Sequence, residues 1–176
     1  MFENLYGFNK EEIKKSLIED EILTFTDRYK FVNELKPIYT IFEEEIPVIA
    51  STSFSNTLNS QICIIVRTKS NNFFIIVNAL FTEFLTEQEQ LVLLCHEYGH
   101  YQDMTNNYKA KNELEEEARA DASSVRYCGF DATIETMKKV DTLVSLAFDY
   151  DLAIDAETQA RLDILEHFKE RKNKNN

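Results

Sequence analysis

Residues 86–100 read TEQEQLVLLCHEYGH, and the fold of the second half of the chain is organised around them. Thr86 followed by Glu89 is the pattern of a capping box, in which two side chains satisfy free backbone amides at a helix N-terminus. The apolar run that follows is typical of a helix that packs in a core. We therefore expect one helix that begins near Thr86 and carries both His96 and His100 on the same face.

The sequence beyond this helix predicts further helices and no strands. The whole chain has only three Gly and two Pro, which argues against an all-β fold with many tight turns. A break is expected around Thr105 to Tyr108, and Gly129 suits the position just after a helix C-terminus. The expected helices cover Asn112–Tyr127, Ala132–Phe148 and Ala156–Arg171.

Short helices and a small sheet are expected before residue 86. Two apolar runs flank a polar, turn-prone segment at residues 67–72, which predicts a β-hairpin. Both runs are continuously apolar, so their strands should be largely buried on both faces. The expected elements are helices at Asn9–Glu19 and Asp27–Lys36, one or two strands within Ile38–Ala50, a loop at Ser51–Ser60, and hairpin strands at Ile62–Val66 and Phe73–Val77.

These elements together predict an α+β fold in a single domain that spans residues 1–176. A 44% apolar content supplies enough material for a core. Residues 1–85 should form N-terminal helices and a small antiparallel or mixed sheet, and residues 86–128 the helices that carry the histidines. Residues 129–176 should form C-terminal helices with a frayed tail.

Composition and charge exclude several classes of function. The formal net charge of −12 argues against a nucleic-acid partner, because phosphate backbones are bound by clustered Lys and Arg. The one basic run, Lys169 to Lys174, also carries Glu170 and Asn173 and is typical of a solvated terminus. No run of residues is long and apolar enough to span a membrane. We expect protein or peptide partners.

The cysteines and the N-terminus indicate a cytoplasmic protein. Cys63, Cys95 and Cys128 are odd in number, scattered and without a C-x-x-C spacing, which suits a reducing compartment. Residues 1–10 lack the basic segment and apolar run of a signal peptide.

His96 and His100 have the spacing of two zinc ligands. Four residues apart on a helix, they project from one face and can both bring Nε2 within about 2.0–2.1 Å of one Zn²⁺ ion. Glu97 lies about 100° round the helix, where it can reach a zinc-bound water without being a ligand. Zinc lowers the pKa of that water to about 7, and Glu97 would act as the general base.

A third protein ligand is expected from residues 113–121, with a fourth position left for water. Glu117 is the favoured ligand, since Asp121 shares its helical face and could accept the other ring N–H of a ligating histidine. Glu116 and Asp103 are alternatives, and the acidic run could also be only a solvated helix face. The metzincin pattern would require a third histidine where this chain has Asn106.

Other residues near these motifs have weaker assignments. Ala118, Ala120 and Ala122 should keep their helix slim enough to approach the histidine helix closely. Cys95 is interpreted as packed core and not as a ligand. An oxyanion would need a further donor, and the open candidates are Arg126, Tyr127, Tyr150 and His167.

His96-Glu97-Tyr98-Gly99-His100 together with Glu117-Ala118-Arg119-Ala120-Asp121 resembles the gluzincin metallopeptidases related to HtpX and the CAAX prenyl proteases. In that family H-E-x-x-H is followed by E-x-x-A-D on the next helix. The similarity covers roughly Phe73 to Leu165 and includes a late segment, Asp155 to Arg161, which here lacks the usual His-Pro. Short relatives of the ImmA/IrrE kind share a similar motif.

The resemblance implies a zincin-like fold and a zinc-dependent endopeptidase. His96, His100 and Glu117 would bind one Zn²⁺, Glu97 would be catalytic, and Asp121 would orient a histidine. Many relatives are embedded in membranes, but this sequence has no spanning segment. The main alternative is a catalytically inactive zincin-fold protein with a regulatory or binding role, and a second is an interaction protein without a metal.

Overall fold

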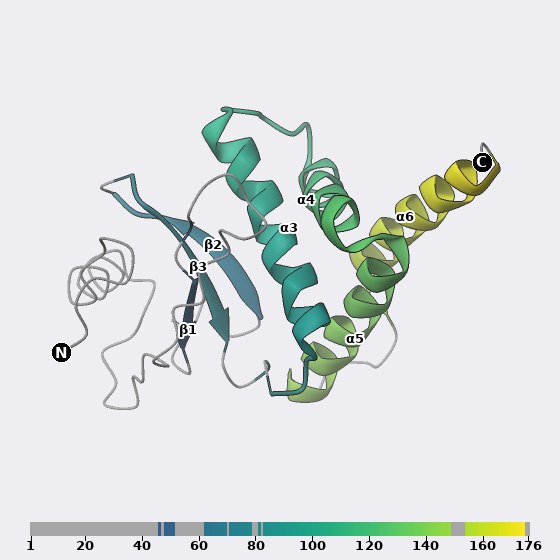
Figure 1. Ribbon diagram of the computed structural model, residues 1–176, viewed down its shortest axis with the longest axis horizontal. Coiled ribbons are helices and arrows are strands. Elements are labelled where there is room, and N and C mark those ends of the chain that lie inside the picture. The colour runs from purple at the N-terminus through teal and green to yellow at the C-terminus, as the bar shows by residue number, and fades with distance from the viewer. Residues whose placement is uncertain are drawn as a thin grey trace. The chain divides into compact units, whose positions relative to one another are not determined.

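Figure 1 shows the computed structural model of the chain, which describes residues 46, 48–51, 62–69, 71–78, 81, 83–148 and 154–174. The chain divides into two compact units, Met1–Thr82 and Glu83–Asn176, and each is described by itself. The helices predicted at Asn9–Glu19 and Asp27–Lys36 lie outside the described residues.

The first unit contains a three-stranded mixed sheet in the order β1-β3-β2. Strands β2 (Cys63–Arg67) and β3 (Phe73–Asn78) pair antiparallel, with Ile65 opposite Ile75, so the predicted hairpin is present. Strand β1 (Val48–Ser51) pairs parallel with β3, which gives the sheet its mixed character.

The two hairpin strands differ in burial. In β3 the five residues from Phe74 to Asn78 are all buried, as expected for the central strand. In β2 the burial alternates, with Cys63 and Ile65 buried and Ile64 half-buried. The expectation that both strands are largely buried on both faces thus fits β3 better than β2, in which Ile64 and Val66 are half-buried and Arg67 is exposed.

The second unit consists, in its described part, of four helices: α3 (Glu87–Thr105), α4 (Glu113–Cys128), α5 (Phe130–Phe148) and α6 (Ala156–Lys174). The ends of α3 and α4 follow the sequence signals. Thr86 and Glu89 form the predicted capping box, and Asn112 caps α4 by accepting a hydrogen bond from the amide of Glu115. Gly129 ends α4 with a φ of 87°, a conformation that side chains disfavour.

Helices α3 and α4 lie side by side in an unusually close contact (Figure 1). A Cβ atom placed on Gly99 would lie 2.7 Å from Cα of Ala120, so this contact requires glycine on α3. Ala120 is buried, whereas Ala122 is exposed. The hydroxyl of Ser124 on α4 donates a hydrogen bond of 2.9 Å to the carbonyl of Val92 on α3. These contacts fix the two helices that carry the histidines and the acidic motif.

Helices α5 and α6 pack through a small apolar cluster. Leu162 and Leu165 of α6 and Ile134 of α5 are its buried members, and Val125, Phe130 and Met137 pack against it. Burial of each such side chain contributes about 1.5–3 kcal/mol, so the cluster is sufficient to anchor α6. No helix in the described part of the chain has the length and apolar character needed to cross a membrane.

The described part thus combines a small mixed sheet with four helices and is mostly helical. The predicted α+β class and the order of a sheet followed by helices are confirmed at this level.

Candidate metal centre

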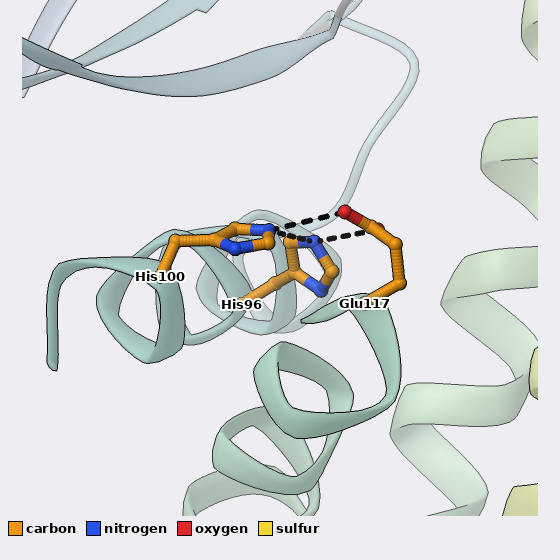
Figure 2. A group of neighbouring side chains, drawn as sticks. All are labelled: His96, His100 and Glu117. Atoms are coloured by element: carbon orange, nitrogen blue, oxygen red, sulfur yellow. Dashed lines mark hydrogen bonds and ion pairs between the residues drawn. The ribbon is translucent and has the colours of Figure 1, made fainter. Parts of the chain in front are cut away.

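His96 and His100 point their imidazoles from one face of α3 towards the same point (Figure 2). Their Nε2 atoms lie 3.1 Å apart. The ring planes are inclined by 80°, so the rings meet edge to face and do not stack. The four-residue spacing has therefore brought the two nitrogen atoms together, as the sequence predicted.

Glu117 reaches the same point from α4 (Figure 2). Its Oε2 lies 3.3 Å from Nε2 of His96, and its Oε1 lies 3.3 Å from Nε2 of His100. These three residues are the one group of His, Cys, Asp or Glu in the described part of the chain that could hold a metal ion. The group draws on two helices because α3 and α4 approach so closely at Gly99.

The donor atoms of the three residues lie at separations close to those between zinc ligands. Ligands placed tetrahedrally at about 2.0–2.1 Å from zinc lie about 3.3 Å from one another. Here the two Nε2 atoms are 3.1 Å apart, and each lies 3.3 Å from a different oxygen of Glu117. Two imidazole nitrogens and one carboxylate oxygen suit zinc and its neighbours among the transition metals, whereas Mg²⁺ and Ca²⁺ prefer oxygen ligands alone.

Asp121 sets the orientation of His96. Its Oδ1 lies 2.9 Å from Nδ1 of His96. Burial raises the pKa of Asp121, but hydrogen bonds from His96 and Arg161 outweigh it and keep the pKa below its usual range, so the carboxylate accepts and Nδ1 of His96 donates. In neutral His96 this leaves the lone pair on Nε2, directed at the metal position.

The site favours a positive charge between the three donors. Burial lowers the pKa of His96, but hydrogen bonds to Asp121 and Glu117 outweigh it and raise the pKa to about 10. The pKa of Glu117 is held well below its usual range: burial opposes this, but contacts with His100 and His96 prevail. A metal cation bound between the donors would supply such a charge.

Arg161 of α6 is a member of the site that the sequence motifs did not identify. Its Nε and Nη2 donate to the two oxygens of Asp121 at 2.9 Å and 2.7 Å, and its Nη1 lies 2.8 Å from Oε2 of Glu117. In the sequence this residue stood out only as the end of the late segment, Asp155 to Arg161, that resembles the metallopeptidases. With neutral histidines, the carboxylates of Glu97, Glu117 and Asp121 and the guanidinium of Arg161 leave two negative charges, which Zn²⁺ would balance.

Glu97 is buried on α3 with 6% of its surface exposed. It is not among the three converging residues. Its negative charge contributes to the raised pKa of His96, so its carboxylate lies within electrostatic reach of the site. Burial of a carboxylate is costly, which makes it unusual outside functional sites.

The alternative ligands are placed elsewhere. Asp103 forms a two-pronged ion pair with Arg119, with both contacts at 2.7 Å. Glu116 is 54% exposed, and its Oε1 lies 3.8 Å from Nδ1 of His100, the nitrogen that faces away from the three-donor contact. Cys95 is buried with its sulfur 3.8 Å from that of Cys128, as expected for packed core.

Three of the four candidates for an oxyanion donor lie among the described residues. Arg126 and His167 are exposed, and Tyr127 is half-buried with its ring edge-on to Tyr98. Tyr150 lies outside the described residues.

Comparison of the chain with protein-family models, with curated proteins and with solved structures gives no match. The function is therefore inferred from the geometry of the site.

Proposed function

We propose that the chain is a zinc-dependent endopeptidase with a zincin-like fold, acting on protein or peptide substrates. The observation that carries the proposal is the convergence of His96, His100 and Glu117 on one point from two helices. Glu97, the buried carboxylate next to His96 in the sequence, supplies the group that distinguishes a catalytic site from a storage site.

The number of ligands supports a catalytic role. Structural zinc sites are closed by four protein ligands, whereas catalytic sites have three and keep one position for water or substrate. The group formed by the described residues has three members. A purely structural site would have no use for an adjacent buried carboxylate.

Each residue has a defined role in peptide hydrolysis. His96, His100 and Glu117 would hold zinc, which when bound supplies a Lewis acid that activates water and polarises the substrate carbonyl. Glu97 accepts the proton of the attacking water and passes it to the leaving amine. Asp121 keeps Nδ1 of His96 protonated so that Nε2 remains free to bind.

The test is cleavage of a peptide library by the zinc-loaded protein, read by mass spectrometry, beside Glu97→Gln. This variant keeps the shape of the side chain but loses the base, so turnover should fall by about 10²–10⁴-fold with the zinc content unchanged. Glu135→Gln makes the same chemical change at an exposed residue of α5 and should leave turnover as in the wild type.

Two results would contradict the proposal. Equal turnover by Glu97→Gln and the wild type would show that Glu97 is not the general base, which would contradict the mechanism. A zinc-loaded wild type that cleaves no member of the library would instead favour the catalytically inactive regulatory or binding protein. The cytoplasmic location stays a prediction from the cysteine pattern.

A further inference from the structure

We propose that Arg161 is a positioning residue, which fixes Glu117 and Asp121 in the orientations that zinc binding requires and so makes the site dependent on α6. The inference rests on the metal part of the proposed function. It assigns a role to a residue that lies on neither of the two motif helices.

One guanidinium contacts both carboxylates of the motif on α4. Two of its nitrogens hold the two oxygens of Asp121, and the third contacts only one oxygen of Glu117, Oε2. Asp121 is therefore held rigidly in the plane of the guanidinium, and through Nδ1 it fixes the ring of His96. The other oxygen of Glu117, Oε1, lies 3.3 Å from Nε2 of His100.

Arg161 is itself fixed by the packing of α6. Its side chain is 17% exposed and lies on the same helix as Leu162 and Leu165, which are buried in the apolar cluster with Ile134. The apolar packing of α6, which does not depend on a metal, therefore places the guanidinium at the site. The site is organised before a metal arrives, which reduces the ordering cost of binding.

Charge and geometry make opposite predictions for the loss of this residue. A guanidinium 2.8 Å from a metal ligand repels a divalent cation, so its removal by charge alone would tighten zinc binding. If its role is to orient the ligands, its removal weakens binding, typically about 10- to 100-fold for residues that support metal ligands. The sign of the change separates the two roles.

The experiment measures zinc affinity by competition with a chromophoric chelator for the wild type, Arg161→Gln and Arg161→Lys. Lysine keeps the positive charge, but its single ammonium group cannot pair with both oxygens of Asp121 and contact Glu117 at the same time. We expect both variants to bind zinc at least about 10-fold more weakly than the wild type. Circular dichroism of the metal-free proteins identifies any variant that fails to fold, and Arg161→Lys alone then decides.

A matched control exists in the same chain. Arg119 on α4 also makes a two-pronged pair with an aspartate, Asp103, but does not contact the three donors. Arg119→Gln should therefore bind zinc as the wild type does. Cobalt substitution adds a spectroscopic readout: the intensity of the visible bands, which reports coordination number, should change in both Arg161 variants and not in Arg119→Gln.

The outcomes separate the inference from the proposed function. Zinc bound equally or more tightly by Arg161→Gln, or at wild-type affinity by Arg161→Lys, would overturn the positioning role and leave the metal site standing. Failure of the wild type to bind zinc would overturn both.

Discussion

Substitution of Gly99 by alanine tests the contact that brings the two halves of the candidate metal site together. The added Cβ would lie 2.7 Å from Cα of Ala120 and 3.0 Å from Cβ of Ser123. Carbon atoms are most stable at about 3.5–4.0 Å, so α4 would have to retreat by about 1 Å. The nearest atom belongs to the backbone of a helix, which cannot turn aside as a flexible side chain can.

The expected loss of stability follows from two opposing terms. Overpacking of a core contact costs about 1–3 kcal/mol, and a clash with backbone belongs at the upper end. Alanine is favoured over glycine in a helix by about 1 kcal/mol. The net change is a loss of about 2 kcal/mol, which lowers the melting temperature of a chain of this size by about 4–8 °C. The same retreat would carry Glu117 away from His96 and His100 and weaken zinc binding.

The assay is chemical and thermal unfolding of the metal-free protein in the presence of a chelator. Ala122→Ser adds one heavy atom to an exposed position on α4 and should change stability by less than about 0.5 kcal/mol. A Gly99→Ala protein about 1 kcal/mol more stable than the wild type, as at an open helical position, would refute the reasoning about this contact.

Four further predictions concern the same two helices. Ser124→Ala should lose about 1 kcal/mol, because its hydroxyl bonds to the carbonyl of Val92. Ser123→Ala should be neutral or stabilising in the same unfolding experiment, since the buried Ser123 hydroxyl has no hydrogen-bond partner among the described residues. Equal losses of stability in the two serine variants would contradict the role given to the Ser124 hydrogen bond. The raised pKa of His96, about 10, stabilises the metal-free fold fully below the unfolded value of about 6.5, and this stability should be lost as pH rises from about 6.5 through 10. Melting temperatures across that range should therefore fall less steeply for His96→Gln than for the wild type, and parallel curves would contradict this. Free zinc at about 1,000 times its dissociation constant should raise the melting temperature by about 8–16 °C, reversibly with chelator, and Glu117→Ala should abolish the rise.

Local signals in the sequence predicted the helix boundaries around the site well. The Thr86–Glu89 capping box and the glycine at position 129 act through neighbouring residues, so the sequence alone contains the interaction. The start of α5 was less accurate, because the helix begins at Phe130 and not near Ala132. With a positive φ, Gly129 completes the turn in a single residue, so α5 needs no linker.

Contacts between distant segments could not be predicted in the same way. The parallel pairing of β1 with β3 joins residues far apart in sequence, and no local pattern specifies it. Arg161 lies forty residues from Asp121, and its role depends on the packing of α6. His96, His100 and Glu117 could be singled out as candidate ligands because the two histidines have a fixed helical spacing and the glutamate belongs to a recognisable motif. Their convergence is a tertiary result that depends on Gly99.

The most direct test of the account is the zinc content of the purified protein, measured by elemental analysis beside three histidine and glutamate variants. The account predicts about one zinc per chain in the wild type and in His167→Ala, which removes the exposed third histidine as a control. His96→Ala and Glu117→Ala should each lose most of the metal. The assignment of His96, His100 and Glu117 as the metal site would be contradicted by a wild type that holds no zinc after reconstitution. It would also be contradicted if His96→Ala and Glu117→Ala retained zinc at the wild-type level.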